Sequence, residues 1–222
     1  MGTIIYKQLL LLVLFTMGQV IRAGRYDRAA NERNAIPSLE LLGHNLKWHR
    51  LDDGVMGGQS ETVHSSSDNA RELDFAGQIN TQGGGFCSIR APIEGGLPKD
   101  TSAVRICYVG DGKTYKILFS DGSKSAFGPS RRSPSWQTDL PTKKGVEDTA
   151  IIRLGSLIPS LQGGPTGTDL KIDPTQVNEM GFMLSLKLSS GESNPVETYG
   201  SGIFPFSLKI RSIESVCADE MN

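Results

Sequence analysis

Short runs of β-forming residues, separated by clusters of Gly, Pro, Asp and Ser, fill the chain from Trp48 onward. Several runs alternate apolar and polar residues, as Ser207 to Ile213 does, and this period of two is typical of half-buried antiparallel strands. The pattern predicts strands at 59–64, 72–79, 86–90, 103–109, 114–120, 135–139, 149–154, 181–188 and 206–213. So many short strands with almost no helix predict an all-β sandwich of two antiparallel sheets.

The connections between these runs contain residues that favour turns. Gly110 to Gly112 (GDG) predicts a hairpin turn because Asp-Gly supplies the positive φ of tight turns, and Asp121-Gly122 predicts another. Gly155 to Asp169 is rich in Gly and Pro and predicts a long irregular connection. Helix is confined to a short turn over Asp173 to Met180, with Asp173 as N-cap and Pro at the first helical position, and to a short helix starting at Ser38.

Two glycine clusters stand out, Asp52 to Ser60 (DDGVMGGQS) and Gly83 to Phe86 (GGGF). Glycines this dense mark backbone with positive φ or a close approach to another segment, so we interpret both clusters as framework. No Lys-Ser/Thr follows them, and no apolar strand leads into them as a nucleotide-binding turn requires. Together with the GDG turn, the predicted framework residues are Gly54, Met56, Gly57, Gly58, Gly84, Gly85, Phe86, Gly110, Asp111 and Gly112.

The N-terminal segment has one Lys ahead of an apolar run from Leu9 to Met17, with small residues at Ala23 and Gly24. This is the plan of a secretory signal peptide. A retained membrane anchor over Ile4 to Ile21 and a mitochondrial import sequence are the alternatives. The 23 Lys and Arg residues balance 24 Asp and Glu residues, so no net field favours nucleic acid, and we exclude that class of partner.

No catalytic or metal-binding set can be assembled from the sequence. His44, His49 and His64 have no Cys or carboxylate at metal spacing beside them, and no nucleophile-elbow pattern occurs. Asp52 and Asp53 form the one tight acidic pair near a glycine turn. We interpret them as turn caps that accept backbone N–H bonds, with a bound cation such as Ca²⁺ as the alternative. The sequence therefore predicts no enzyme activity, no metal and no cofactor.

Aromatic side chains that also carry a polar group, Tyr and Trp, are the candidates for a binding surface. Trp48, Tyr115 and Trp136, with Asp52 and Asp53, form the predicted ligand or partner site, because exposed rings flanked by polar groups stack on sugars. Burial of the rings in the core is the alternative.

Three cysteines leave the redox state open. Cys87 and Cys107 fall in predicted strands, where they are either buried small side chains or, in an oxidising compartment, a disulfide. Cys217 lies in a predicted polar tail.

A series of motifs in order resembles one known family. They are Trp48 with DDGVMGGQS, FAGQI at 75–79, GGGFCSIR at 83–90, GDGKTY at 110–115, Trp136, IDP at 172–174, MGFML at 180–184 and FPFSLKIRSIE at 204–214. This series is similar to the domain of the complex I intermediate-associated protein 30 family. The resemblance implies a galactose-binding-like jelly roll and the following division: 1–24 leader, 25–46 linker, 47–215 family domain, 216–222 polar tail.

The same resemblance implies a function. Members of the family are known as assembly chaperones of mitochondrial NADH:ubiquinone oxidoreductase (complex I), so we expect a non-catalytic module that binds immature subunits through one sheet face or the loop from Gly155 to Asp169. The leader lacks the Arg-rich composition of a mitochondrial presequence. The alternative is therefore a secreted or lumenal binding domain whose ligand is a carbohydrate.

Overall fold

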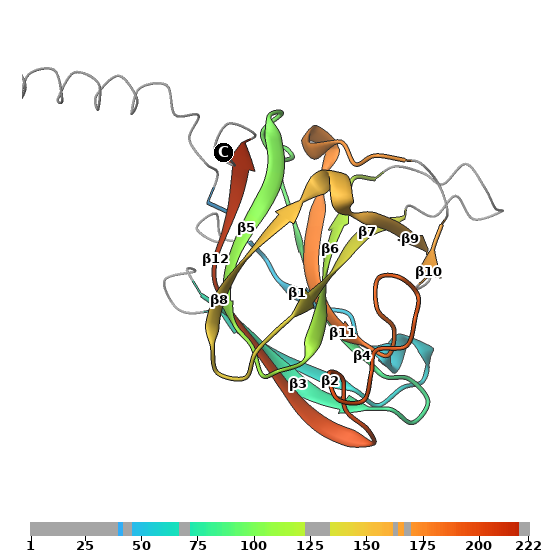
Figure 1. The fold of residues 1–222 in the computed structure, drawn as a ribbon. Helices are drawn as coiled ribbons and strands as arrows, with labels where there is room; N and C mark the ends of the chain where they lie inside the picture. The colour runs from blue at the N-terminus through green and yellow to red at the C-terminus, as the bar shows by residue number, and fades with distance from the viewer. Residues whose placement is uncertain are drawn as a thin grey trace, which may run out of the picture. The chain divides into compact units, whose positions relative to one another are not determined.

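The computed structural model describes residues 40–41, 46–66, 72–122, 134–161, 164–166 and 170–217, except for the side chains of residues 64–66. The chain separates into two units, Met1–Pro37 and Ser38–Asn222, and every described residue belongs to the second. That unit consists of two antiparallel sheets, which confirms the predicted jelly-roll sandwich with little helix (Figure 1). The predicted leader, most of the linker, His44 and residues 218–222 lie outside the described residues. The helix predicted from Ser38 is wrong at the two of its residues that are described: Glu40 forms an antiparallel bridge with Glu214, and Leu41 donates its N–H to the Ile213 carbonyl.

The first sheet has seven strands in the order β1-β4-β11-β6-β7-β9-β10. In that order their bounds are His49–Arg50, Phe86–Pro92, Glu179–Ser185, Thr114–Ser120, Ser135–Pro141, Ile158–Leu161 and Gly164–Pro165.

The second sheet has five strands in the order β2-β3-β12-β5-β8. Their bounds are Glu61–Ser66, Leu73–Asn80, Ile203–Cys217, Thr101–Val109 and Glu147–Arg153. The longest strand, β12, lies at the centre and pairs with β3 on one side and β5 on the other. Among the described residues, three short 3-10 turns complete the elements: η2 (Asp53–Met56), η3 (Leu154–Ser156) and η4 (Pro174–Gln176).

The core lies between the inner faces of the two sheets. Tyr115 of β6 meets Phe75 of β3 and Phe206 of β12 edge-on, with ring centroids 6.2 and 6.4 Å away. The rings of Phe75 and Phe206 lie 4.9 Å apart in the same manner. Edge-to-face pairs contribute about 0.5–1.5 kcal/mol each beyond the burial of their area. This aromatic cluster therefore fixes how the sheets face each other.

The predicted GDG hairpin is wrong. Gly112 has the expected positive φ of 94°, but the strands it connects, β5 and β6, belong to different sheets and do not pair. A turn with positive φ is needed equally at a hairpin and at a crossover between sheets, so the sequence could not separate the two. At Asp121-Gly122 the strands on either side, β6 and β7, are antiparallel neighbours and Gly122 has the expected positive φ of 66°. The predicted tight turn is wrong, however, because β7 begins only at Ser135; residues 123–133 of the connection lie outside the described residues.

Two further predictions need correction. The stretch Gly155 to Asp169 is not wholly irregular, because it contains part of η3, the strand β9 and the edge strand β10. The last strand begins at Ile203 and continues to Cys217, so Val216 and Cys217, predicted in a polar tail, are buried in β12. The predicted turn at Asp173 is confirmed as η4, with the Asp173 side chain accepting a bond from the Thr175 N–H, but it ends before β11 begins at Glu179.

Candidate functional site

The carboxylate of Asp53 is the point where the two glycine clusters meet. Asp53 opens η2 and is fully buried. Its Oδ1 accepts the backbone N–H of Ser60 at 2.9 Å, and its Oδ2 accepts the Ser60 hydroxyl at 2.6 Å. The same Oδ2 accepts the backbone N–H groups of Gly85 at 2.6 Å and Phe86 at 3.3 Å. One side chain therefore ties η2 to the start of β4.

Hydrogen bonding keeps this buried carboxylate ionised. Burial alone raises the pKa of Asp53, but the bonds from the Ser60 hydroxyl and from the N–H groups of Gly85, Ser60 and Phe86 outweigh it, and the pKa lies below its ordinary value. Glycine is required around it because a Cβ on Gly58 or on Gly84 would overlap the Asp53 side chain. This close approach explains Gly58 and Gly84, whereas Gly57, Gly83 and Gly85 have positive φ.

Asp52 makes a second, parallel set of contacts. Its carboxylate accepts the backbone N–H of Thr62 at 2.9 Å, the Thr62 hydroxyl, and the N–H of Ser88 at 3.4 Å. Both acids thus accept backbone N–H bonds as predicted, but not as turn caps: the donors lie in segments remote in sequence, and Asp52, at the N-cap of η2, makes no side-chain bond to its own turn. The cation alternative loses its support, because these oxygens face N–H and O–H donors and the described residues contain no group of three or more metal-ligating side chains.

Asp111 of the GDG turn also serves the fold. Its Oδ1 accepts the Tyr115 hydroxyl at 2.9 Å and the Lys113 N–H at 3.2 Å, while Oδ2 accepts the Ser207 N–H at 3.0 Å. Because Ser207 belongs to β12 and Tyr115 to β6, this carboxylate joins the two sheets.

The aromatic rings predicted to bind a ligand are mostly core residues. Tyr115 is 0% and Trp136 is 1% exposed, so neither ring offers a surface for stacking, and their position supports the alternative of burial in the core. Trp48 is half-buried and packs on Phe182 of β11, with ring centroids 5.9 Å apart. The prediction that these residues with Asp52 and Asp53 form one binding site is therefore corrected to a framework role for Tyr115, Trp136 and both acids.

The Cys87–Cys107 bridge is not formed. Cys87 points into the core from β4, whereas Cys107 on β5 lies between the inward-facing residues Ile106 and Tyr108 and so faces outward from the other sheet. Both are free thiols. Burial raises the pKa of Cys87 to about 12, with the Asp52 and Asp53 charges adding to the rise.

The outer face of the seven-stranded sheet was not predicted as a site. Core residues Ile89, Ile117 and Phe182 point inward, so their neighbours along β4, β6 and β11 point outward. We call the outward polar side chains the polar face: Ser88, Arg90, Lys116, Gln137, Asp139 and Glu179. Alternation along these strands was visible in the sequence, but the burial of the polar positions was not.

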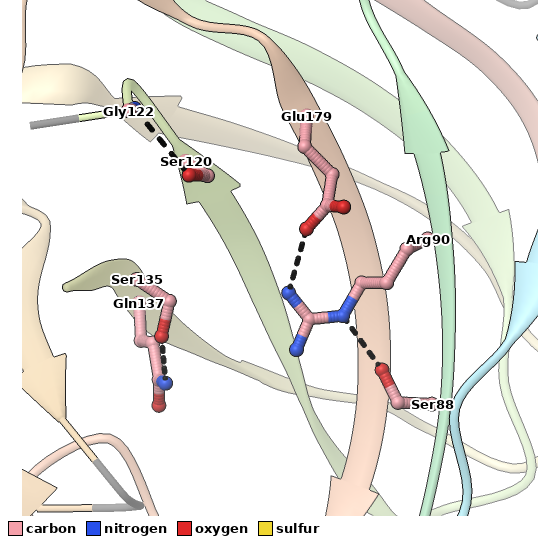
Figure 2. A network of polar contacts seen from close by, with 7 residues as sticks. All are labelled: Ser88, Arg90, Ser120, Gly122, Ser135, Gln137 and Glu179. Carbon is pink, nitrogen blue, oxygen red and sulfur yellow. Dashed lines mark hydrogen bonds and ion pairs between the residues drawn. The ribbon is translucent and has the colours of Figure 1, made fainter. Parts of the chain in front are cut away.

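Figure 2 shows Arg90 reaching from β4 across β11 towards Glu179. Its guanidinium lies 3.4 Å from the Glu179 carboxylate, and its Nε donates to the Ser88 hydroxyl at 2.9 Å. On the β7 side, the Gln137 amide donates to the Ser135 hydroxyl at 2.7 Å and accepts from Lys116 Nζ at 3.4 Å. Asp139 accepts the N–H and the hydroxyl of Ser189 at 2.8 and 2.9 Å.

Of the two cations of the polar face, Lys116 is buried and Arg90 is largely shielded from solvent. Lys116 is 2% exposed, and burial lowers its pKa to about 8; the charge of Asp139 opposes this shift and that of Lys187 adds to it. Burial also lowers the pKa of Arg90, and the ion pair with Glu179 opposes that shift. Charged groups held out of water in this way are costly unless they are paired, so they mark a candidate functional site.

The outer face of the five-stranded sheet is different. It carries exposed or half-exposed ion pairs between Lys209 and Asp74 at 3.9 Å, between Arg105 and Glu214 at 3.0 Å, and between Arg211 and both Glu72 and Glu147. Opposite charges satisfy one another there in contact with solvent. Such pairs contribute little and need no ligand.

Exposed apolar side chains gather at the turn that Asp53 anchors. Val55 and Met56 of η2 are 70% and 68% exposed, and Leu51 just before them is 40% exposed. Met56, predicted as framework, therefore points to solvent. Within the part of the chain that the structure describes, no helix is long and apolar enough to cross a membrane.

Comparison with known proteins gives one family and one fold. The family model of Complex I intermediate-associated protein 30 matches residues 39–210. A search of curated proteins finds no match.

Among solved structures, the family 11 carbohydrate-binding module of the cellulosomal cellulase Lic26A-Cel5E of Clostridium thermocellum is similar, with a TM-score of 0.53 and 13% identity over 83% of this chain and 97% of that one. The family 11 module of Clostridium thermocellum in complex with a β-1,3-1,4-mixed-linked tetrasaccharide gives a TM-score of 0.52 and 14% identity over 83% and 98% of the two chains. At such identity the likeness shows the fold alone.

Proposed function

The chain belongs to the complex I intermediate-associated protein 30 family, and from this membership we propose that it is a non-catalytic assembly factor that binds immature subunits of respiratory complex I. The observation that carries the proposal is the match over residues 39–210, which takes in every strand of both sheets except the end of β12. The match therefore covers the folded unit as a whole and not a single shared motif.

The polar face is the surface that we propose for the subunits. Of the two outer faces, only this one holds charged side chains out of water, whereas the charges of the five-stranded sheet are paired in contact with solvent. The exposed Val55 and Met56 provide an apolar contact at the end of the same sandwich. Exposed Met side chains adapt to differently shaped apolar partners, which suits a factor that meets incomplete subunits.

Proximity labelling with the full chain tagged at its C-terminus tests this function. Complex I subunits, recovered above the level of a tag-only control, are the expected result, and depletion of the protein is expected to reduce mature complex I on native gels. Recovery of no complex I subunit, with complex I unchanged on depletion, would contradict the proposal.

The proposal also requires that the protein reach mitochondria. We therefore expect the tagged chain to lie in mitochondria, with the apolar leader acting as an atypical import sequence. Microscopy together with the N-terminal residue of the mature protein decides this. A secretory location with a mature end near Gly24 would instead favour the lumenal alternative.

Carbohydrate binding is the second candidate function, because the fold is that of modules such as the one solved with a mixed-linked tetrasaccharide. The residues of the polar face argue against it: none of the six is aromatic, and Tyr115 and Trp136 are buried. Sugar recognition commonly uses an exposed ring. A glycan array probed with the purified chain tests this candidate, and a specific signal would favour it over the assembly role.

A further inference from the structure

We propose that the polar face contains a buried anion subsite, formed by Lys116 and Arg90, which receives one carboxylate group from an acidic side chain of the partner protein. The identification of the carboxylate donor as a partner protein rests on the proposed function. The subsite itself rests on the geometry and charge of the described residues alone.

The side chains of Arg90 and Lys116 reach the same row of paired residues on the seven-stranded sheet, each at one end of that row. In register across the sheet, Arg90 lies opposite Gly181, Gly181 opposite Leu118, and Leu118 opposite Gln137. The Arg90 side chain lies over Gly181, where any Cβ would overlap its Cδ. Lys116 Nζ reaches Gln137 at the other end of the row. Gly181 and the fully buried Leu118 therefore form an apolar floor between two cations.

Of the two cations that form the subsite, Lys116 is the one without a direct ion pair among the described residues. Its one hydrogen bond among the described residues goes to a neutral amide oxygen at 3.4 Å, and no described carboxylate lies within 4.0 Å of its Nζ. A buried ammonium needs a paired anion to offset the loss of water. With a pKa of about 8 it is still mostly protonated at neutral pH, so the unpaired charge is present under ordinary conditions.

The neighbouring charges do not cancel it. Glu179 is paired with Arg90. Asp139 lies opposite Lys116 and its charge favours the ammonium form, but the hydrogen bonds of both its oxygens go to Ser189 and not to Lys116. Lys187 adds a further positive charge near Lys116. The three cations Arg90, Lys116 and Lys187 therefore exceed the two anions Glu179 and Asp139 by one positive charge.

A single negative charge matches this excess. A carboxylate carries one charge and two oxygens, which can accept from Lys116 and from a guanidinium N–H of Arg90 together. A phosphate dianion would bring a second charge that the subsite has no free cation to meet. Arg90 keeps 11% and Glu179 34% of its side-chain surface exposed, so the acidic group approaches from that side.

Thermal unfolding of the purified full chain in sodium acetate tests the subsite, with sodium chloride at equal ionic strength as reference. Acetate is the probe because it is the end of an Asp or Glu side chain. Binding to the native state alone is expected to raise the unfolding midpoint by about 3 °C at an acetate concentration tenfold above its Kd. Lys116→Met keeps the length of the side chain, removes the charge and is expected to abolish the acetate-specific shift.

Lys209→Met is the matched control. It makes the same chemical change on the outer face of the other sheet, where Lys209 is half-exposed and pairs with Asp74, and it should leave the acetate shift intact. An equal shift in Lys116→Met and the wild type, no shift in the wild type, or a larger shift with phosphate than with acetate would each overturn the carboxylate subsite.

Acylation of Lys116, followed by mass spectrometry as a function of pH, gives a readout that does not depend on stability. Bound acetate favours the charged amine, so the pKa of Lys116 should rise and its acylation at a given pH should fall. Unchanged Lys116 acylation with and without acetate would contradict the subsite.

The two proposals fail separately. An acetate-specific shift without recovery of complex I subunits would keep the subsite and remove the assembly role. Recovery of those subunits equally by the wild type and Lys116→Met would keep the assembly role and remove the partner's carboxylate from Lys116.

Discussion

At the scale of single residues, three carboxylates connect separate parts of this protein. Asp53 joins η2 to β4, Asp52 joins the same turn to Thr62 and Ser88, and Asp111 joins β6 to β12. Each accepts backbone N–H groups that no strand partner satisfies. Because a buried donor without an acceptor costs about 1–3 kcal/mol, these acids are predicted to be sensitive positions.

Asp53→Asn is expected to lower the free energy of unfolding by about 2–4 kcal/mol, because an amide offers only one acceptor oxygen to four donors and turns its NH₂ towards N–H groups. Urea unfolding measures the change. Asp148→Asn, at an exposed position of β8, is the matched control and should change stability little. Equal stability in the two variants would contradict the structural role of the Asp53 hydrogen bonds.

The pH dependence of stability follows from the lowered pKa of Asp53. A carboxyl whose pKa is lower in the folded than in the unfolded protein contributes stability that is complete above the ordinary value of 3.8 and is lost as pH falls through the folded pKa. We therefore expect the wild type to lose stability below that value more steeply than Asp53→Asn. Denaturant unfolding across the acid range compares the slopes, and parallel curves would show that Asp53 is not the group responsible.

The thiols should differ in reactivity because only thiolates react readily. Cys107 is half-exposed, whereas Cys87 is fully buried with its pKa raised to about 12. Iodoacetamide labelling of the native protein should modify Cys107 first and Cys87 only after unfolding. Early labelling of Cys87, or loss of both thiols to a bridge, would contradict the structure.

At the scale of elements, alternation predicted where most strands lie but not how they assemble. The strand over Thr114–Ser120 was predicted to the residue, since every second position is a core residue and the flanks carry turn chemistry. The short strands β1, β9 and β10 were missed, because two to four residues are too few to show a period of two. The GDG turn was assigned to the wrong pairing because its φ requirement is local and sheet membership is not.

The site was less predictable than the fold for a related reason. The predicted binding site rests on residue type alone: Trp48, Asp52, Asp53, Tyr115 and Trp136. Residue type does not indicate which face of a strand is covered by the rest of the protein. Lys116 looked like an ordinary outward lysine within an alternating strand, although the structure shows it buried. No short-range pattern around position 116 reports the burial of its side chain.

Glycine replacements test the contact between η2 and the β3–β4 connection. Gly84→Ala brings a methyl group into overlap with the Asp53 side chain. It is expected to destabilise the protein by about 2–4 kcal/mol through strain and through loss of the Asp53 hydrogen bonds. Gly54 lies in η2, next to Asp53, and an added Cβ there would have nothing within 4 Å. Gly54→Ala should therefore be neutral or slightly stabilising. Thermal unfolding compares the two, and similar midpoints would contradict the close approach.

At the scale of the whole molecule, β12 determines whether the second sheet exists. It separates β3 from β5, which do not pair with each other, and it supplies the core residues Phe206, Leu208, Ile210 and Ile213. Deletion of residues 203–222 is therefore expected to abolish cooperative unfolding. Deletion of residues 218–222 alone should preserve it. Circular dichroism melting distinguishes these outcomes, and a cooperative transition without β12 would show that the first sheet folds by itself.

The central position of β12 has a consequence during protein synthesis. Translation produces β12 after all other strands that the structure describes, yet both β3 and β5 need it as a neighbour. Until it leaves the ribosome, the nascent chain holds two unpaired strand edges and an aromatic cluster that lacks Phe206, a state prone to wrong pairing. The protein is thus expected to need chaperones itself while it is being made.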